Sequence, residues 1–459
     1  MLPHLLTPSG SPDHPRMPRR AFLRLMGAAG GGLALAATGC VGRLNTPSPT
    51  LPSTGPTTPT SLPLSPTPTL APSPTVRPPT PTPQLSRLLE AEAAAYARAF
   101  GLDETEVIRR AALLQVPRTS SDSISIVQDP DTSTPLLIAN PDGSWRRASL
   151  KELAAPSGIR VCNLLDQGQW PFLSEEFNFG LITSGWGWST QPTSSTQYSF
   201  QWEDSQITAG RNHGITNFRL MHLVAPHDGE LPTWLQQGGY SADELMRILR
   251  KYITDVMHHF EGAVGEYVVI NEPFFPGNVF LDAVGQDYID IAFETARKAN
   301  PSAVLLFNCW GNHSPAGPYT AQTKRIVDRL SQKSLVDKVG LQMHIGAYEA
   351  SPERIARTIL EYGIPAAITE FDVDMRDIAG SSDERYALQA DTYESVLGAA
   401  ISAAVTDLGF WGCNDSLSWL ENPEFYSSPD ADPNMWDGAA LPKPAYYAAR
   451  RILLQALLR

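Results

Sequence analysis

Short apolar runs recur along the second part of the chain, and several of them end abruptly in polar or charged residues. One such run ends at Glu272 and another at Glu370. Runs of this kind are typical of strands that are buried on both faces of a parallel sheet. Stretches with helical spacing, such as residues 319–333 and 352–362, lie between the runs. This alternation predicts an α/β fold with parallel strands.

The numbering of the two glutamates predicts a particular α/β fold. Glu272 and Glu370 differ by 98 in residue number, and a (β/α)8 barrel of ~250 residues uses ~31 residues for each strand–helix unit. The interval therefore fits three units, which places Glu272 at the end of strand 4 and Glu370 at the end of strand 7. We predict a (β/α)8 TIM barrel. Its strands 1, 2, 3, 5 and 6 are expected at residues 158–165, 178–183, 214–224, 303–308 and 339–344.

A glutamate at the end of a strand can have either of two roles. It can cap the following helix or pair with an arginine, or it can belong to a catalytic site, because barrel enzymes place their chemistry at the carboxyl ends of their strands. In this chain two strands bring a carboxylate to the same end of the barrel, at Glu272 and Glu370. Hydrolysis of a glycosidic bond requires such a pair. We therefore favour a catalytic site.

Five motifs follow one another in an order that resembles glycoside hydrolase family 10, the retaining endo-β-1,4-xylanases. The motifs are residues 269–272 (VINE), 340–344 (GLQMH), 368–372 (ITEFD), 411–419 (WGCNDSLSW) and 442–447 (PKPAYY). The triplet Asn-Glu-Pro alone occurs in many barrel glycosidases, so the ordered set carries the resemblance. It extends from Trp145 to the C-terminus, and we assign residues 145–459 to the barrel.

The resemblance implies a role for each matching residue. Glu370 is expected to be the nucleophile and Glu272 the acid/base of a two-step mechanism that retains the anomeric configuration. Contacts to the substrate are expected at Asn271, His222, His227, Gln342, His344, Asn308, Trp411 and Trp419. A structural role is the alternative for the lone histidines, and a place in the core is the alternative for the two tryptophans. No cofactor is implied, and no set of His, Cys and Asp residues has the spacing of a metal site.

The sequence departs from the family after the expected strand 2. The family usually carries Glu-Asn and Met-Lys-Trp there, which hold the second sugar from the cleaved bond, whereas residues 184–188 of this chain read SGWGW. Trp186 and Trp188 are either aromatic platforms for that sugar or core residues. The first hypothesis is therefore a xylanase. Hydrolysis of another β-glycan is the second, and a catalytically idle surface carbohydrate-binding protein is the third.

The net charge of the chain limits the kinds of molecule that it is expected to bind. The first 84 residues hold six arginines and one acidic residue, and because the whole chain carries −13, residues 85–459 carry −18. A domain this acidic is a poor candidate for binding nucleic acid. It suits a soluble enzyme that acts on a neutral polysaccharide such as xylan. We expect a monomer without a nucleic-acid partner.

Residues 1–40 resemble a secretory signal. Arg19 and Arg20 precede a short apolar run, and small residues lead up to Cys40. The run is too short and too rich in glycine for a membrane span, and the paired arginines favour twin-arginine export. We expect cleavage before Cys40 and acylation of this cysteine, which would hold the enzyme at the outside of the cell membrane. The alternative is a signal whose cleavage releases a soluble protein.

A spacer separates this signal from the folded part of the chain. In residues 46–83, 14 of 38 residues are proline and most others are Thr or Ser, a composition typical of extended polyproline II. We assign residues 41–84 to a disordered linker. Residues 85–110 have helical spacing and residues 116–144 look irregular. Residues 85–144 are therefore expected to form a helical and irregular N-terminal extension.

Three cysteines remain besides Cys40. Cys162, Cys309 and Cys413 fall on or just after expected strands. An odd number of cysteines cannot all pair within one chain. We expect buried free thiols.

Overall fold

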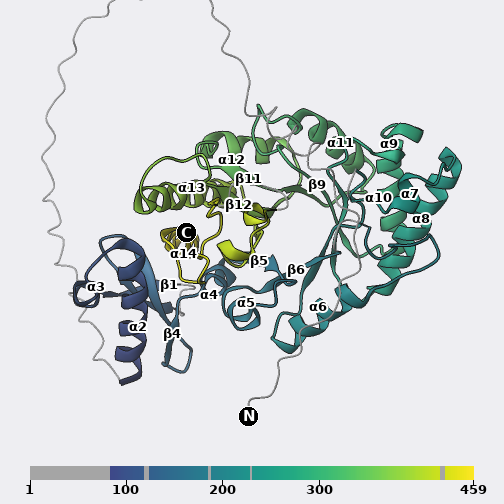
Figure 1. Cartoon of the computed structure of the whole chain (residues 1–459). Coiled ribbons are helices and arrows are strands. Elements are labelled where there is room, and N and C mark those ends of the chain that lie inside the picture. Colours follow the sequence, from purple (N-terminus) through teal and green to yellow (C-terminus); the bar gives the residue numbers. More distant parts are fainter. Residues whose placement is uncertain (1–82, 118–122, 185–187, 228–229, 424–429) are drawn as a thin grey trace, which may run out of the picture. The chain divides into compact units, whose positions relative to one another are not determined.

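The computed structural model describes most of the chain after the expected linker (Figure 1). The expected signal, Cys40 and Trp186 lie outside the described residues. In the part of the chain that the structure describes, no helix is both long enough and apolar enough to cross a membrane. The described residues are 83–459 without the short segments 118–122, 185–187, 228–229 and 424–429.

A parallel barrel with eight strand positions forms the largest part of the fold, which confirms the predicted TIM barrel. The sixth position is divided between two short strands, β10 and β11. Because β10 pairs with β12 as well as with β9, the sheet closes on itself. The strands are β5 (Arg160–Leu164), β6 (Phe179–Thr183), β7 (Phe218–Met221), β8 (Glu266–Asn271), β9 (Val304–Cys309), β10 (Lys338–Leu341), β11 (His344–Gly346), β12 (Ala366–Asp374) and β13 (Asp407–Phe410).

Amphipathic helices cover the outside of the barrel (Figure 1). Two of the longest begin with a reciprocal capping box, Ser241 with Glu244 and Ser381 with Glu384, which satisfies backbone N–H groups that the helix itself leaves free. The helices of this layer are α4 (Leu150–Ala154), α5 (Trp170–Glu176), α6 (Gln201–Asn212), α7 (Thr233–Gln236), α8 (Ala242–His259), α9 (Val279–Val284), α10 (Asp287–Ala299), α11 (Thr320–Gln332), α12 (Pro352–Glu361), α13 (Ser382–Ser402) and α14 (Pro444–Leu458).

The N-terminal extension is more regular than the sequence suggested. Two helices, α2 (Pro83–Phe100) and α3 (Glu104–Arg110), precede an antiparallel sheet in which consecutive strands are neighbours. The prediction that residues 116–144 are irregular is therefore wrong. The Pro, Asp, Ser and Gly residues of this segment form its turns, while alternating apolar residues form short strands between them. The strands are β1 (Ala112–Pro117), β2 (Ser123–Asp129), β3 (Thr134–Ala139) and β4 (Trp145–Arg147).

Buried polar contacts attach the extension to α14. Arg450 is fully buried and donates to Glu92 of α2 at 2.9 Å and to the carbonyl of Leu136 in β3 at 2.7 Å. The ring of Tyr96 packs edge-on against that of Tyr447, with 5.0 Å between centroids. Burying an arginine is costly unless its charge is paired and hydrogen-bonded, so Glu92 and the carbonyl of Leu136 stabilise the packing of the extension against α14.

Five charged residues form a buried cluster at the amino ends of the barrel strands, which we call the basal ion cluster. Arg219 donates to Glu266 at 2.5 Å and to Asp407 at 3.2 Å. Lys338 contacts Asp407 at 2.5 Å and Arg160 contacts Glu266 at 2.8 Å. Burial opposes the ionisation of Glu266 and Asp407, but Arg219 and the other cations outweigh it and lower the pKa of both carboxyls. At the amino end of a barrel such contacts serve stability rather than chemistry.

The cysteines follow the prediction of buried free thiols. Cys162, Cys309 and Cys413 are unpaired and buried. Burial raises the pKa of the Cys162 thiol to about 12, so this group stays neutral and behaves as a small apolar side chain.

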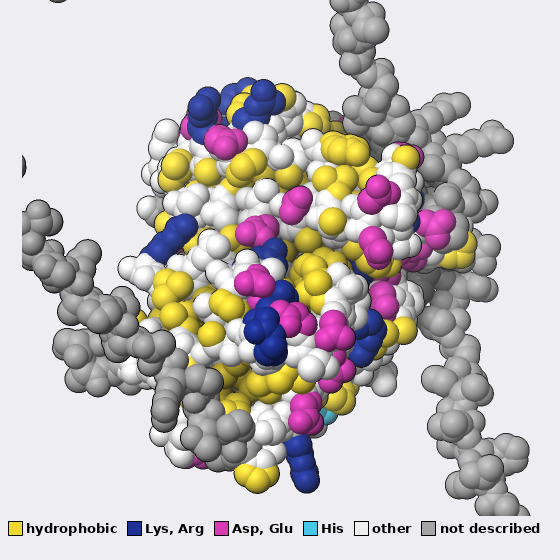
Figure 2. Space-filling model, turned by 90° about the vertical axis from the view of Figure 1, so that its left-hand side faces the viewer, with side chains coloured by type: hydrophobic (Ala, Val, Ile, Leu, Met, Phe, Trp, Pro, Cys, Tyr) yellow, Lys and Arg dark blue, Asp and Glu magenta, His cyan; other side chains and the backbone are white. Residues whose placement is uncertain are grey.

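Figure 2 shows the face of the molecule that lies on the left of Figure 1. Acidic and basic side chains are intermixed with apolar ones on the described part of this face. Such mixing is typical of an ordinary solvated surface.

Candidate active site

The two glutamates singled out in the sequence lie at the same end of the barrel, Glu272 directly after β8 and Glu370 in β12, just beyond its pairing with β10. Backbone hydrogen bonds fix both positions, from Glu272 N–H to the carbonyl of Asn308 at 3.1 Å and from Glu370 N–H to that of Gln342 at 3.0 Å. The backbone of Glu272 has a φ of 48°. Such left-handed backbone is unfavourable for a side chain of this size and is concentrated at functional sites.

Glu370 is buried and surrounded by hydrogen-bond donors. Its Oε1 accepts from Asn308 Nδ2 at 2.6 Å and from His222 Nε2 at 3.4 Å, while its Oε2 accepts from His344 Nε2 at 3.2 Å. Burial alone would raise the pKa of this carboxyl. The hydrogen bonds from His222 and His344 outweigh burial and lower the pKa to about 2. Glu370 is therefore ionised at any physiological pH, as a nucleophile must be.

His344 connects Glu370 to a second carboxylate. Its Nδ1 lies 2.8 Å from Asp372 Oδ1, and Asp372 also accepts from Trp419 Nε1 at 2.9 Å. Burial disfavours the imidazolium, but Asp372 and Glu370 outweigh this and raise the pKa of His344 to about 10. Both ring nitrogens of the imidazolium therefore donate, one to each carboxylate.

Glu272 lies in a different environment from Glu370. Its side chain is 19% exposed, and its Oε2 lies 3.1 Å from His227 Nε2. Its Oε1 accepts from Gln342 Nε2 at 2.9 Å. No arginine, lysine or second imidazole among the described residues forms an ion pair with it. Because their surroundings differ, the two glutamates can hold different protonation states, which is the condition for an acid and a nucleophile to work side by side.

Three amide side chains connect the two glutamates. Gln342 Nε2 donates to Asn271 Oδ1 at 3.1 Å as well as to Glu272, and Asn308 Nδ2 donates to Asn271 Oδ1 at 2.8 Å as well as to Glu370. With both bonds going to its oxygen, the amide of Asn271 is oriented so that its Nδ2 faces away from them. Among the described residues none accepts from this nitrogen, which is thus available to a substrate.

Asn308 makes hydrogen bonds within the site. Its side chain is 0% exposed and lies beneath the carboxylates, where its Oδ1 accepts from Thr369 Oγ1 at 2.7 Å. All its polar atoms are used within the protein. In this arrangement Asn308 positions Glu370 and Asn271, and its direct contact with a substrate stays a prediction.

Trp188 is placed differently from the prediction of a sugar platform. The side chain is 0% exposed, its ring stacks on Tyr252 with 3.6 Å between centroids, and its Nε1 donates to Gln191 at 2.9 Å. A fully buried ring cannot stack on a sugar, so the alternative of a core residue holds. Trp186, the other half of the proposed platform, lies outside the described residues.

Trp411 and Trp419 lie beside His222 and His344. Both are half-buried. The centroid of the Trp411 ring lies 6.4 Å from that of His222 and 6.2 Å from that of His344. The centroid of the Trp419 ring lies 5.1 Å from that of His344. Contact of either ring with a sugar stays a prediction.

The last sequence motif fixes the segment that carries these tryptophans. Lys443 is buried and donates to Asp415 at 2.9 Å, and Asp415 also accepts from the backbone N–H of Asn434 at 2.8 Å. Burial raises the pKa of Asp415 to about 6 against the opposing effect of Lys443. Lys443 therefore holds the segment around Asp415 from outside the site.

The sequence analysis missed one acidic residue of the site. Glu230 lies in the loop that follows β7, three residues beyond His227. Burial raises the pKa of its carboxyl to about 7, and the charges of His227, His222, Glu272 and Glu370 also act on it. A single Glu in an irregular loop carries no periodicity or motif, so nothing in the sequence marked it.

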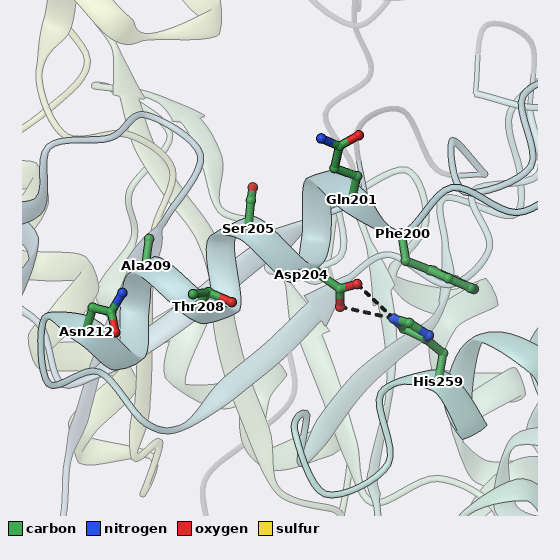
Figure 3. A pocket seen from close by; sticks show the side chains of 8 residues that line it. All are labelled: Phe200, Gln201, Asp204, Ser205, Thr208, Ala209, Asn212 and His259. Atoms are coloured by element: carbon green, nitrogen blue, oxygen red, sulfur yellow. Dashed lines mark hydrogen bonds and ion pairs between the residues drawn. The ribbon is translucent and has the colours of Figure 1, made fainter.

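A shallow depression of about 700 Å³ lies elsewhere, on the outside of the barrel along α6 (Figure 3). Asp204 points from α6 to His259, whose Nε2 lies 3.0 Å from the carboxylate. The Phe200 ring stacks with the rings of His259 and Tyr198, with 3.8 Å and 5.3 Å between the ring centroids. Since these groups already contact one another, they offer neither a free aromatic face nor a free charge. Among the described residues no group of three or more His, Cys, Asp or Glu side chains is arranged to hold a metal ion.

Comparisons with known proteins agree with this geometry. The family model described as "Glycosyl hydrolase family 10" matches residues 161–452, which is well over half of the chain. Endo-1,4-beta-xylanase A of Humicola insolens is 29% identical over 285 residues, covering 60% of this chain and 73% of that protein. Endo-1,4-beta-xylanase B of Thermotoga neapolitana is 27% identical over 293 residues, covering 61% and 82%.

Solved structures show the same fold. The xylanase 10B of Thermotoga petrophila RKU-1 in complex with xylobiose has a TM-score of 0.61 at 24% identity, covering 68% of this chain and 99% of that one. The native xylanase10C of Cellvibrio japonicus has a TM-score of 0.62 at 22% identity, covering 67% and 73%. The barrel is thus shared with enzymes whose sequences have diverged widely.

Proposed function

Because the chain belongs to glycosyl hydrolase family 10, and is thus a glycoside hydrolase, we propose that it cleaves the β-1,4 bonds of xylan internally and with retention of configuration. The names of its relatives support this substrate, since they are endo-1,4-β-xylanases. The observation that carries the mechanism is the contrast between Glu370, which two imidazoles and an amide hold ionised, and Glu272, which is more exposed and contacts one amide and one imidazole.

In the first step Glu370 is the nucleophile. Its carboxylate oxygen forms a bond to the anomeric carbon while the bond from that carbon to the leaving oxygen breaks. The proton of the Glu272 carboxyl passes to the leaving oxygen at the same time, so that the departing sugar leaves as an alcohol. His344 and His222 keep Glu370 charged until the new bond forms.

In the second step Glu272 acts as a base. It takes a proton from water while the water oxygen attacks the anomeric carbon and the bond to Glu370 breaks. The two inversions together give net retention. Asn271 assists both steps, because its Nδ2 can donate to the 2-hydroxyl of the sugar at the cleavage site, a contact that strengthens as positive charge develops on the ring.

Hydrolysis of another β-glycan is the second candidate. It is favoured by residues 184–188, which lack the acid and the Lys that the family pattern implies for the second sugar. The burial of Trp188 removes one aromatic replacement for those hydrogen bonds. With fewer directional contacts at that sugar, the enzyme would discriminate less between xylose and glucose units.

A panel of soluble β-glycans, assayed for reducing ends, tests both candidates. The chain with native Glu272 and Glu370 should release reducing ends fastest from xylan, with a rapid early fall in viscosity that marks internal cleavage. Rapid cleavage of a β-glucan with little action on xylan would favour the second candidate. No release from any glycan would reject both and leave only a carbohydrate-binding role.

Azide tests the role of Glu272. The variant Glu272→Ala should cleave an aryl xyloside with an activated leaving group far better than xylan, because that leaving group needs no proton. Azide should raise its rate and give a β-glycosyl azide, in which the configuration is retained. An α-azide product would reassign the nucleophile to Glu272.

We also propose that acylation of Cys40 holds the enzyme at the outer face of the cell membrane, with residues 41–84 as a spacer. The sequence around Arg19, Arg20 and Cys40 supports this. Labelling with a fatty-acid analogue should mark the native chain and leave Cys40→Ser unmarked. Equal labelling of both chains would contradict the anchor.

A further inference from the structure

A series of aromatic rings begins beside Glu272. The centroid of the Phe275 ring lies 5.4 Å from that of His227, whose Nε2 lies 3.1 Å from Glu272 Oε2. The centroid of the Tyr319 ring lies 5.7 Å from that of Phe275, and the centroid of the Trp310 ring lies 6.1 Å from that of Tyr319. These separations are those of aromatic side chains in contact. We call Phe275, Tyr319 and Trp310 the aromatic row.

The hydrophobic core does not account for the aromatic row. Phe275 and Trp310 are partly exposed, and among the described residues they do not belong to the side chains that pack against the core. Tyr319 does pack against the core, and its ring stacks with that of Phe274 at 5.2 Å between centroids. Tyr319 therefore anchors the row, while Phe275 and Trp310 keep exposed ring surface. Partly exposed aromatic side chains are typical of the lining of ligand sites.

The aromatic row lies on the leaving-group side of the proposed site. Phe275 follows β8 and Trp310 follows β9, whereas Trp411 follows β13. Because β13 is separated from β9 by β10 and β12, the aromatic row and Trp411 lie on different sides of this end of the barrel. In the proposed mechanism Glu272 gives its proton to the leaving oxygen, so the departing sugar lies next to Glu272. It therefore also lies next to Phe275.

The chemistry of the aromatic row fits a neutral sugar. A sugar ring has a face of C–H groups, and this apolar face packs against an aromatic ring. Among the described residues, the hydroxyl of Tyr319 and the indole N–H of Trp310 have no hydrogen-bond partner, so both can bind sugar hydroxyls. The row itself contains no charged side chain. By microscopic reversibility, a site that holds the departing sugar also holds an incoming one.

We propose that the aromatic row is an acceptor site, and that the enzyme transfers glycosyl groups to sugars as well as to water. Glu272 takes the proton of an acceptor hydroxyl while the hydroxyl oxygen forms a bond to the anomeric carbon. The bond from that carbon to Glu370 breaks, and its electron pair returns to the carboxylate. The product is a longer neutral glycan. This inference rests on the proposed function, because it uses the same covalent intermediate.

Competition between an acceptor and water for this intermediate tests the inference. A nitrophenyl β-xylobioside supplies the intermediate, and methyl β-xyloside is the acceptor. The ratio of the transfer product, a methyl xylotrioside, to the hydrolysis product, xylobiose, is measured by chromatography. Both products come from one intermediate and both need Glu272, so neither a loss of folded enzyme nor damage to the catalytic groups alters the ratio. In the native chain the ratio should rise with acceptor concentration until the site is filled.

Removal of the Phe275 ring should lower this ratio. In Phe275→Ala the loss of one stacking contact should lower it about fivefold at low acceptor concentration. Phe275→Tyr keeps the ring and should keep the native ratio. Phe100→Ala is the matched control, because Phe100 is also a partly exposed ring in contact with a tyrosine, Tyr96 at 4.8 Å between centroids, but lies on α2 in the extension. This variant should give the native ratio.

Two results would overturn the inference, namely the absence of a transfer product from the native chain at every acceptor concentration and a native ratio in Phe275→Ala. Release of nitrophenol with either result would leave the proposed function intact, since hydrolysis needs no acceptor. If the native chain releases no nitrophenol, the proposed function itself fails, and the acceptor site fails with it.

Discussion

The two ends of the barrel each bury a group of carboxylates, but they hold them in opposite ways. In the basal ion cluster, Glu266 and Asp407 contact three cations of permanent or nearly permanent charge. At the other end, the side chains of Glu272 and Glu370 contact only amides and imidazoles among the described side chains. Each cation of the basal ion cluster keeps its carboxylate partner ionised. The amides and imidazoles at the other end can also accommodate a carboxylate that has lost its negative charge.

This difference shows what separates a structural carboxylate from a reactive one. Arginine cannot lose its proton in a protein, so a carboxylate paired with Arg219 is held ionised and inaccessible. An imidazole or an amide stabilises the ionised carboxylate. It still allows a carboxylate oxygen to form a covalent bond and the negative charge to be neutralised. In the proposed mechanism, the choice of partner rather than burial distinguishes the reactive carboxylates from the structural ones. Four variants test this comparison.

The largest effect is expected at the catalytic end, on turnover. Glu370→Ala should lower kcat by roughly 10⁴-fold or more on every substrate, because no other group can form the covalent intermediate. The variant should keep its circular dichroism spectrum, because amides and imidazoles tolerate the loss of the charge. If Glu370→Ala unfolded instead, the catalytic end would resemble the basal end and the comparison would break down.

At the basal end the expected effect is on folding. Glu266→Gln leaves Arg219 and Arg160 with Asp407 as their one remaining carboxylate, and breaking a buried ion pair in this way costs about 3–5 kcal/mol of unfolding free energy. Denaturant unfolding should show this loss, while kcat of the folded variant stays within about twofold of the native value. Glu106→Gln, at an exposed ion pair of α3, is the control and should unfold like the native chain. A large fall in kcat for Glu266→Gln would refute the division of roles.

His344 sharpens the comparison because its charge depends on pH. Its pKa is about 10 in the folded chain and about 6.5 when unfolded, so the folded state binds the proton more tightly. The stabilisation is complete below pH 6.5 and is lost as pH rises towards 10. His344→Gln should therefore be less stable than the native chain by roughly 3 kcal/mol near pH 6.

The difference between these two chains should shrink steadily up to pH 10, as measured by urea unfolding at each pH. A deficit that stayed constant with pH would mean that His344 contributes by packing alone. The basal variant Glu266→Gln supplies the contrast, because its deficit should hardly change between pH 6 and 10.

The smallest effect is expected at a carboxyl with no partner. Glu203 is buried, and neither of its oxygens has a hydrogen-bond partner among the described residues. Burial raises its pKa to about 7, so its ionisation opposes folding, and the native chain loses stability as pH rises from about 4.5 to 7. Glu203→Gln should be more stable than the native chain by roughly 2 kcal/mol at pH 8 and equal to it near pH 4.5. A native-like stability at pH 8 would show that a partner supports this carboxylate.

The placement of Glu272 and Glu370 at one end of the barrel could be predicted from the sequence because strand order is encoded locally. Each apolar run that ends in a polar residue marks one strand, and parallel strands deliver their carboxyl ends to one side. Glu272, Glu370 and His344 were found in this way, with the resemblance assigning their roles. The basal ion cluster uses the same strands, but Arg219 and Glu266 look like ordinary solvated charges until the barrel closes.

What the sequence could not provide were properties that depend on neighbours distant along the chain. The burial of Trp188 depends on Tyr252 of α8, and the support role of Asn308 depends on Thr369 of β12. The sheet of the extension was hidden because the turn residues between its strands dominate the composition. Glu230 belongs to the same loop as His227, and only the fold brings His227 to Glu272.

The attachment of the extension to α14 has a consequence for the timing of synthesis. The hydrogen bond between Glu92 and Arg450 joins residues 358 positions apart. During synthesis α2 leaves the ribosome early, and α14 leaves it after every other described element. The face of α2 that packs against α14 therefore stays exposed, and Glu92 stays without Arg450, while the barrel is made. Contacts that span so much of a chain slow folding and prolong the time for which apolar surface can aggregate. The packing of α14 against α2 therefore ends the period in which this surface of α2 is exposed and can aggregate.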